Sequence, residues 1–242
     1  MNVLVVDIGG TGIKIWRTGE SDKVRIPSEG DLSPERMVQQ IRENLDDWKY
    51  DCVSLGFPGE VVNGRPISEP YNLGDGWVHF DYPHAFETPV RLLNDAAMQA
   101  LGSYEGGRML YIGLGTSMGT TLIVDGKIVT LALGHLRFCK GESFEHYLSR
   151  KGLELHGPKR WRRAVCDAAT TLKSAFLADY VVLGGGNAKK LEELPEGCRR
   201  GGNENAYFGG LKMWEGEAPE SGLKVVGQPD TADASQPQAA QA

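Results

Sequence analysis

Short apolar runs alternate with amphipathic segments along most of the chain. The runs, rich in Val, Ile, Leu and Thr, predict strands at residues 3–6, 13–16, 52–56, 90–93, 109–112, 120–124, 127–131 and 180–183. Apolar positions at helical spacing predict helices from 34 to about 48, then at 96–101, 143–150, 158–177 and 204–214. Ser33 followed by Pro34 is a typical helix start. Strands and helices in this order predict an α/β fold.

Two segments lack such periodicity. Residues 68–89 are polar, aromatic and irregular, and we expect a long loop of the kind that is often functional. From Glu215 the composition shifts to Glu, Pro, Ser, Gln and Ala. Because such a segment has too few apolar side chains to form a core, residues 215–242 are predicted to be a disordered tail.

Two glycine-containing hairpins share one design. The segments "VLVVDIGGTGIKIW" and "MLYIGLGTSMGTTLIV" each read as strand, glycine turn, strand. A dinucleotide fingerprint needs a helix directly after its glycines, and a P-loop ends in Gly-Lys-Ser/Thr, so neither motif fits. Glycine turns expose backbone N–H groups to an anion, although an ordinary hairpin remains the alternative for each turn. The pair indicates a duplicated fold that closes over a nucleotide from both sides.

Composition and charge argue against several kinds of partner and site. The 242 residues include 40% hydrophobic residues, and 26 Lys and Arg stand against 32 Asp and Glu, for a net charge of −6. This acidic balance argues against nucleic acid or an acidic membrane as partner. The four cysteines are far apart and form no C-x-x-C pair, so the sequence predicts neither a zinc site nor a disulfide framework. We expect a cytoplasmic protein without a signal peptide or membrane span.

The ordered set of motifs resembles the ROK sugar kinases of the actin-like ATPase superfamily, and most closely the polyphosphate glucokinases. The motifs are "DIGGTGIK", "GFPG", "NLGDGW", "LLNDAA", "GLGTSMGTTLIVDG", "LGHL" and "LGGG". The resemblance implies a duplicated RNase H-like, actin-like ATPase fold, with two lobes and a cleft between them. We expect an N-terminal lobe at 1–100, a C-terminal lobe at 101–204, and 205–214 packing back onto the first.

The resemblance also implies a phosphate site and a donor. Phosphate or nucleotide contacts are expected from Asp7, Gly9, Gly10, Thr11, Gly12, Lys14, Gly115, Thr116, Gly119, Gly184, Gly185 and Gly186. Asp7 would lie near Mg²⁺, which suits carboxylate and phosphate oxygens. For Asp7 the alternative is a polar residue that caps the turn, and for the three consecutive glycines it is a plain strand-to-helix turn before Asn187. The donor would be ATP or polyphosphate.

By the same resemblance Asp95 is the catalytic base. A sugar hydroxyl hardly ionises at neutral pH, so its attack on a phosphoryl group needs a carboxylate that accepts the proton. The alternative is that Asp95 only caps the following helix, whose N-terminus would keep it ionised. Sugar contacts are expected from Pro58, Gly59, Asn72, Asn94, Asp95, His135 and Glu142.

The chain departs from the family pattern at Ala132. Relatives usually have Glu-x-Gly-His where this chain has Ala132-Leu133-Gly134-His135. A carboxylate there would make a charged hydrogen bond to a sugar hydroxyl, worth roughly 1.5–3 kcal/mol. Glu142 is near enough in sequence to replace it. Otherwise the protein binds glucose weakly, prefers another acceptor or has lost catalysis. The family's zinc-binding cysteine cluster is also missing, as in polyphosphate glucokinases, so no structural zinc is expected.

A run of basic residues stands out in this acidic chain. The segment "RKGLELHGPKRWRR" contains Arg150, Lys151, Lys159, Arg160, Arg162 and Arg163. Such a patch could guide polyphosphate, although a solvated helix face is the commoner explanation.

The preferred function is therefore a magnesium-dependent kinase that phosphorylates a hexose, most readily glucose. A non-catalytic sugar or nucleotide sensor is the alternative, as is a phosphotransferase for an N-acetylated sugar or a non-sugar acceptor. ROK repressors carry an N-terminal DNA-binding module, whereas this chain starts at its first strand, so no nucleic-acid partner is expected. The family resemblance is compatible with a homodimer.

Overall fold

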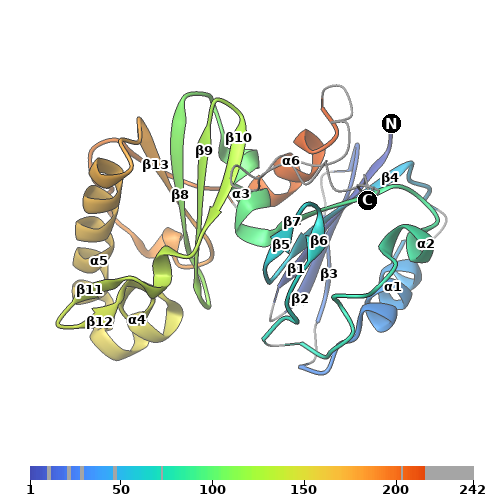
Figure 1. Cartoon of the computed structure of the whole chain (residues 1–242), viewed down its shortest axis with the longest axis horizontal. Helices are drawn as coiled ribbons and strands as arrows, with labels where there is room; N and C mark the ends of the chain where they lie inside the picture. The colour runs from blue at the N-terminus through green and yellow to red at the C-terminus, as the bar shows by residue number, and fades with distance from the viewer. Residues whose placement is uncertain are drawn as a thin grey trace, which may run out of the picture.

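Two five-stranded sheets with the same topology form the framework of the protein (Figure 1). The computed structural model describes residues 1–9, 12–20, 23–27, 30–45, 48–71, 73–202 and 204–215. The first sheet has the order β3-β2-β1-β4-β7, from β1 (Val3–Gly9), β2 (Gly12–Arg17), β3 (Val24–Ile26), β4 (Cys52–Phe57) and β7 (Val90–Asn94). The second has the order β10-β9-β8-β13-β14, from β8 (Arg108–Leu114), β9 (Met118–Val124), β10 (Lys127–Leu131), β13 (Tyr180–Gly184) and β14 (Cys198–Arg200).

The strand directions repeat as well. In each sheet the first three strands in the chain form an antiparallel meander, and two later strands run parallel to the first. A parallel pair needs a crossover connection, and helices supply it in both halves. The duplicated two-lobed α/β fold expected from the paired hairpins is therefore confirmed. We call the half built on the first sheet the N-terminal lobe and the other the C-terminal lobe.

Helices cover the outer face of each sheet and lie between the two sheets (Figure 1). The outer helices are α1 (Pro34–Glu43) and α2 (Tyr82–Phe86) in the N-terminal lobe, and α4 (Phe144–Leu148) and α5 (Arg150–Ala175) in the C-terminal lobe. Between the sheets lie α3 (Asp95–Ser103) and α6 (Asn205–Lys212). Alternate residues of β1 serve the two faces: Leu4 and Val6 join the core under α1 and α2, whereas Val3 and Val5 pack with residues of α3 and α6.

Helices α3 and α6 connect the two lobes. They cross closely at Gly102 and Gly209, where a side chain on either glycine would enter the backbone of the other helix. Helix α6 is tied to the first sheet because Ser54 Oγ donates to the Gly210 carbonyl at 2.6 Å and accepts from Trp214 Nε1 at 2.8 Å. Helix α3 contacts strands of both sheets, so the predicted boundary after residue 100 falls inside it. The division into domains stays a prediction.

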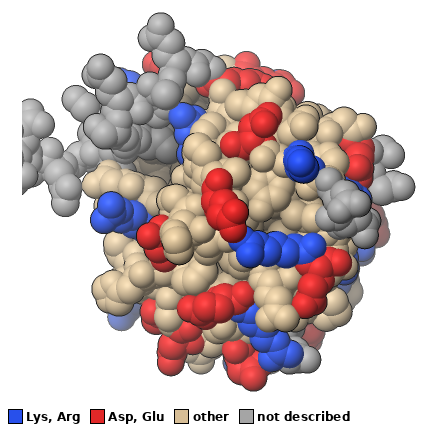
Figure 2. Space-filling model, turned by 90° about the vertical axis from the view of Figure 1, so that its right-hand side faces the viewer, with Lys and Arg blue, Asp and Glu red and all other residues tan. Residues whose placement is uncertain are grey.

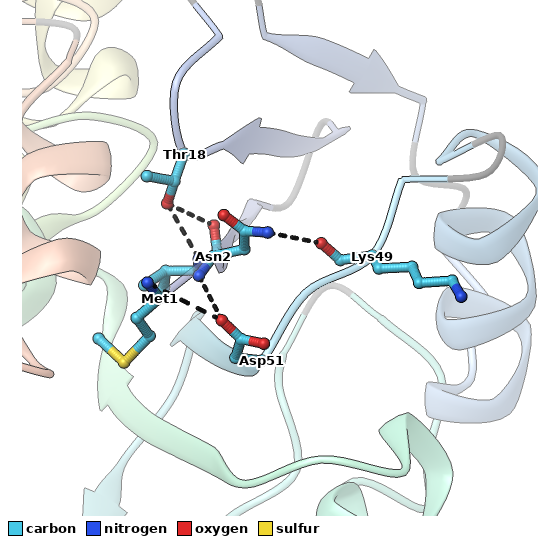
Figure 3. A network of polar contacts seen from close by, with 6 residues as sticks. Met1, Asn2, Thr18, Lys49 and Asp51 are labelled. Carbon is cyan, nitrogen blue, oxygen red and sulfur yellow. Dashed lines mark hydrogen bonds and ion pairs between the residues drawn. The ribbon is translucent and has the colours of Figure 1, made fainter.

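The first residues are held by a polar network beside the start of β4 (Figure 3). The Asn2 backbone N–H donates to Asp51 Oδ2 at 2.7 Å, and its side chain donates to the Lys49 carbonyl at 3.3 Å. The Val3 N–H donates to Thr18 Oγ1 at 2.9 Å. These bonds fix β1 between β2 and β4 at its first residue, and therefore set the position of Asp7 at its far end.

The structure corrects several predicted elements. Strands β3 and β14 were not predicted, and the irregular stretch 68–89 contains α2, capped by Asp81. The predicted helix 143–150 is interrupted, because Ser149 is extended and caps α5 by accepting from the Gly152 N–H. Helix α5 starts at Arg150 and is broken at Gly157 (φ 75°), after which Pro158 starts the part that had been predicted.

Shorter elements complete the fold. They are β5 (Val61–Val62), β6 (Arg65–Pro66), β11 (Arg137–Cys139), β12 (Glu142–Ser143) and the 3₁₀ turns η1 (Leu133–His135) and η2 (Ala188–Lys190). Strands β5 and β6 form a hairpin around Asn63-Gly64. Asn187 precedes only the 3₁₀ turn η2, not the helix expected there. Among the described residues, every helix is too short or too polar to cross a lipid bilayer.

Candidate active site

Asp7 and Lys14 form an ion pair at the end of the first glycine hairpin. They are cross-strand partners on β1 and β2, and Lys14 Nζ lies 2.6 Å from Asp7 Oδ2. Asp7 is only 2% exposed, whereas about a third of the Lys14 side chain is accessible. A buried carboxylate needs such a partner to stay ionised. The apolar strand thus ends in a charged pair that faces α3.

The strands close tightly at this hairpin. Gly9 pairs with Gly12, and a Cβ on Gly12 would lie 3.0 Å from the Ile26 carbonyl of β3. Glycine therefore allows the turn to lie against the neighbouring strand. The predicted site residues Gly10, Thr11 and Asn72 lie outside the described residues.

Asp95 is the first residue of α3 and lies beside Asp7. A Cβ built on Gly56 of β4 would be 3.4 Å from Asp7 Oδ1 and 3.5 Å from Asp95 Cα, so both acids flank this glycine. The same Cβ would collide with the buried Met98 side chain. Gly56 is thus the residue that lets α3 approach the end of β1. Gly56 is the first glycine of "GFPG". The sequence alone does not reveal its contact with α3, because that contact depends on the order of the strands in the sheet.

The pKa of Asp95 is raised to about 7. Burial of the carboxyl group is the main cause, and the negative charge of Asp7 adds to it. The Ala96 N–H, which donates to Asp95 Oδ1 at 2.8 Å, and the Lys14 charge oppose the shift. We expected the helix N-terminus to keep Asp95 ionised. Burial outweighs the Ala96 N–H, so at neutral pH Asp95 is only partly ionised in the free protein. A pKa near neutrality suits a general base.

Asn94, not Asp95, is the N-cap of α3. Asn94 Oδ1 accepts from the Ala96 and Ala97 N–H groups at 3.0 and 3.2 Å, and Nδ2 donates to the Gly59 carbonyl at 3.0 Å. The alternative in which Asp95 only caps the helix is thus incorrect, although its carboxylate accepts one N–H. Asn94 also holds the Pro58-Gly59 turn at the start of α3. Four predicted sugar contacts, Pro58, Gly59, Asn94 and Asp95, therefore lie together.

The second glycine hairpin lies against the N-terminus of α3. Gly119 of β9 leaves room for Ala96, whose Cβ would be 2.6 Å from a Cβ on Gly119. At the tip, the Gly115 N–H donates to the Ser117 carbonyl at 3.3 Å, while Thr116 is exposed. The hairpin therefore reaches the same end of α3 as Asp95, but from the other lobe.

The three consecutive glycines pack on the second hairpin. Gly185 has φ 78°, and a Cβ there would lie 2.9 Å from backbone atoms of Leu114. The Asn187 N–H donates to the Leu114 carbonyl at 3.0 Å. Gly184 leaves room for the Tyr111 ring, whose hydroxyl donates to Gln99 Oε1 of α3 at 2.8 Å. The hydroxyl of Tyr111 thereby joins this turn to the helix that carries Asp95.

Tyr111 and Gln99 had no signal in the sequence, because β8 reads as an ordinary apolar strand. Tyr111 is 1% exposed. Burial, then the charges of Asp95 and Asp7, raise the pKa of its hydroxyl far above the usual range. It therefore stays protonated and acts as a hydrogen-bond donor in the interior.

The carboxylate of Glu145 lies beside Gly134, the residue before His135. A Cβ on Gly134 would lie 3.1 Å from Glu145 Oε2 and 3.3 Å from the Met118 carbonyl at the start of β9. Glu142, in contrast, is largely exposed, and its Oε2 lies 3.7 Å from His146 Nδ1. His135 itself is exposed. The sequence placed Glu142 here; the Ser143 cap, which starts α4 with Glu145 in its first turn, was the signal for Glu145.

The donor atoms at Asp7 fit Mg²⁺. One buried carboxylate with a second beside it matches an ion that binds through one or two carboxylates and completes its shell with water and substrate phosphates. In the part of the chain that the structure describes, no group of three or more His, Cys, Asp or Glu side chains is arranged to hold a metal ion.

Solved structures of similar fold are sugar kinases and a related regulator. An inorganic polyphosphate/ATP-glucomannokinase from Arthrobacter sp. strain KM has a TM-score of 0.72 and 24% identity, covering 86% of this chain and 96% of that one. A ROK family glucokinase from Streptomyces griseus, in complex with glucose and AMPPNP, has 0.70 and 17%, with 88% and 99% covered. A ROK family transcriptional regulator, a homologue of the E. coli MLC protein, has 0.66 and 15%, with 88% and 77% covered.

Curated proteins that match in sequence are sugar kinases too. N-acetylmannosamine kinase of Salmonella newport (strain SL254) is 25% identical over 146 residues, 54% of this chain and 50% of the relative. Polyphosphate glucokinase of Mycobacterium leprae (strain TN) is 22% identical over 208 residues, 77% of this chain and 64% of the relative. The chain thus spans half to under two thirds of their lengths. No family model matches the sequence. In sequence and in fold, the chain is similar to the sugar kinases of the ROK family, as its motifs predict.

Proposed function

We propose that this protein is a sugar kinase that transfers a phosphoryl group from ATP or polyphosphate to a hexose hydroxyl, with glucose as the first acceptor to test. The observation that carries the proposal is the position of Asp95. Its carboxyl group has a pKa of about 7 and lies beside the Asp7–Lys14 pair. The second glycine hairpin approaches the same end of α3.

Asp95 is the proposed base. Its carboxylate accepts the proton of the sugar hydroxyl as that oxygen forms its bond to phosphorus, and the electron pair of the broken bond leaves with the remaining donor phosphate. Half of the Asp95 groups are ionised near pH 7 in the free protein. Asn94 keeps the carboxylate in place because it caps α3 and holds the Gly59 carbonyl.

The phosphates would lie at the two glycine turns. The absence of a side chain at Gly9, Gly12, Gly115 and Gly119 would let phosphate oxygens approach the backbone of the two turns. About a third of the Lys14 side chain is accessible beside Asp7, and it adds a positive charge. Asp7 would hold Mg²⁺, which neutralises charge on the transferring phosphates.

The sugar contacts proposed are Pro58, Gly59, Asn94, Asp95 and His135, with Glu145 supplying the carboxylate that Ala132 cannot. Glu145 Oε2 is near Gly134, directly before His135. Asn72 remains a predicted sugar contact from the sequence. Glu142, which the sequence also predicted, is largely exposed with Oε2 3.7 Å from His146 Nδ1, so we propose Glu145 in its place. A cytoplasmic location is compatible with the four cysteines, which are all unpaired, and a homodimer stays a prediction.

The second candidate is a sugar-binding protein without catalysis. Ala132 favours it, because one of the sugar-binding carboxylates expected from the family is replaced, and a ROK family regulator shares the fold. The same replacement favours a kinase for another acceptor, and N-acetylmannosamine kinase is among the similar proteins.

Purified protein should be assayed with a panel of hexoses, N-acetylated hexoses included, and with ATP or polyphosphate in the presence of Mg²⁺. We expect turnover with at least one sugar and a fall in kcat of about 10²–10⁴-fold in Asp95→Asn, the usual contribution of a general base. Asp125→Asn is the matched control, because Asp125 is an exposed turn residue with φ 49°, which Asn tolerates.

The two candidates give different results. Sugar binding with no turnover in the wild type supports the non-catalytic protein. Full activity in Asp95→Asn would refute the assignment of the base.

A further inference from the structure

A basic cavity lies in the C-terminal lobe, between α5 and the residues after β13. Its volume is about 400 Å³. The lining residues are Leu153, Pro158, Arg162, Lys189, Lys190 and Glu192. Three come from α5 on both sides of the break at Gly157, and three from η2 and the segment that follows it. The break in α5, where φ of Gly157 is 75°, thus occurs in the wall of the cavity.

The lining carries an excess of positive charge. Arg162 Nη1 pairs with Glu192 Oε1 at 2.6 Å, which leaves the charges of Lys189 and Lys190 uncompensated within the lining. Arg162 Nε is buried and donates to no acceptor among the described residues. About a third of the Arg162 side chain is nevertheless accessible, so its exposed guanidinium N–H groups can donate to an anionic ligand in the cavity. None of the six lining residues is aromatic, so the cavity suits an anion better than a planar base.

Both walls of the cavity begin at the second glycine hairpin. The Arg150 N–H donates to the Gly115 carbonyl at 2.8 Å, and from there the first part of α5 leads to the cavity. Its seven residues, 150–156, span about 10 Å at the rise of an α-helix. On the other side, Gly185 packs on Leu114, and the Ala188 N–H donates to the Gly185 carbonyl at 3.1 Å.

Exposed cations mark this route. Arg150 and Lys151 lie at the start of α5, close to the second glycine hairpin. Lys189 and Lys190 lie at the cavity, at the far end of the route. The opposite end of the molecule differs: Figure 2, which faces the end with α1 and α2, shows acidic and basic side chains interspersed. There Arg42, for example, is paired with Glu87 at 3.0 Å. In a protein of net charge −6, the cavity is therefore a local positive site.

We infer that the cavity binds the distal phosphates of inorganic polyphosphate, while the second glycine hairpin holds the end of the chain that reacts. This inference rests on the proposed kinase function and names the donor for it. A phosphate chain carries negative charge along its length, so one molecule can contact the hairpin and the cavity together. ATP, whose distal part is a base and a ribose, has no anion to place there.

The test compares two double variants with the same loss of charge. Lys189→Gln/Lys190→Gln removes the two exposed cations of the cavity. Lys159→Gln/Arg163→Gln removes two exposed cations of α5 that do not line it, and Arg163 there has only a long contact, 3.9 Å, with Asp167. All four side chains are exposed, so neither variant should affect folding. Binding of long-chain polyphosphate, tripolyphosphate and ATP is measured by calorimetry, and KM for each donor in the hexose assay.

We expect the cavity variant to weaken long-chain polyphosphate binding about tenfold or more, since two charge-assisted contacts are lost. The control variant should change it less than twofold, and the KM for ATP should stay constant in both. An equal effect of the two variants, an equal effect on ATP, or no polyphosphate binding by the wild type would overturn the inference. If no sugar is phosphorylated with any donor, the proposed function fails, and the calorimetric comparison still decides whether the cavity binds polyphosphate.

Discussion

The charge pair beside Asp95 should control the pH dependence of the protein in a predictable direction. Burial and the Asp7 charge raise the pKa of Asp95, and the Lys14 charge lowers it. Replacing Asp7 by Asn should therefore lower the pKa of Asp95, and replacing Lys14 by Met should raise it. The two substitutions remove opposite charges from one ion pair, in which Nζ and Oδ2 are 2.6 Å apart, so each is the control for the other.

The expected size follows from the geometry. Asp7 Oδ1 and Asp95 Cα both lie within 3.5 Å of the Cβ position of Gly56. Two charges about 6 Å apart at an effective dielectric constant of about 20 interact by about 2.8 kcal/mol, which is about two pKa units. Because Lys14 already offsets part of the Asp7 charge, we expect shifts of about one unit, to about 6 in Asp7→Asn and about 8 in Lys14→Met.

The direct assay is a carboxyl NMR titration of protein free of metal and sugar, with Asp95→Asn identifying the Asp95 signal. The functional assay is the pH profile of kcat/KM at saturating Mg²⁺. If Asp95 acts as the base, wild-type kcat/KM should fall below pH 7 and reach about one tenth of its plateau at pH 6. Lower absolute rates in both variants are expected, because the proposed function places Asp7 and Lys14 at the phosphates.

An Asp95 signal that titrates near pH 4 in the wild type would refute this prediction, because burial would then have no effect on its pKa. A shift of the Asp95 pKa in the same direction by both substitutions would refute it as well. Such a result would mean that a structural change, rather than the charges of the pair, determines the titration.

Three further predictions test other parts of the site. Glu145→Gln should raise the KM for sugar about 10- to 100-fold, because a charged hydrogen bond is worth roughly 1.5–3 kcal/mol. The control Glu142→Gln should leave this KM within about twofold. An equal effect of the two substitutions in steady-state kinetics would contradict Glu145 as the sugar-binding carboxylate. Gly185→Ala should lower the free energy of unfolding by about 1–3 kcal/mol in urea melts because of its positive φ and its contact with Leu114. Gly186→Ala, where a Cβ meets open space, should be neutral. The folded-state pKa of Asp95 lies above its unfolded value of 3.8, so the stability of the wild type should decline from pH 4 to 7. Asp95→Asn should therefore be more stable than the wild type at pH 8, by up to about 4 kcal/mol. Equal urea midpoints of the two proteins at pH 8 would exclude this linkage.

Local sequence patterns predicted the elements that have a strong period or cap. The apolar runs gave β1, β4 and β8, and the Ser33 cap gave α1, because these signals lie within a few neighbouring residues. Three-residue strands such as β3 and β14 have no such period, since their pairing is determined by the strands beside them. Helix α2 was missed because its five residues follow a polar, irregular loop and are too few to show a helical period.

The candidate site was predictable where one motif carries it and unpredictable where two elements meet. Asp95 and Asn94 follow from "LLNDAA", and Asp7 from the first hairpin. The raised pKa of Asp95 could not be foreseen, because it results from burial against β4 and from Asp7, 88 residues away in the sequence. Glu145 was likewise hidden, because its proximity to Gly134 depends on how α4 packs against η1 and β9.

The duplication itself explains why the chemistry is one-sided. In the first sheet, Asp7 of β1 pairs with Gly56 of β4. At the corresponding place in the second sheet, Gly113 of β8 pairs with Gly184 of β13. The acid of the first hairpin thus has a glycine as its structural counterpart, and the space is taken by Tyr111, whose ring would lie 3.4 Å from a Cβ on Gly113.

This difference gives the lobes separate roles. The N-terminal lobe brings two carboxylates and a lysine to the end of α3, whereas the second hairpin offers backbone N–H groups and a buried hydroxyl that stays protonated. A carboxylate at position 113 would add a third negative charge near Asp95 and Asp7 and raise the pKa of Asp95 further. With a glycine there, the pKa of Asp95 stays near neutrality. Under the proposed function, both halves would then bind one polyanion while only the N-terminal lobe removes a proton.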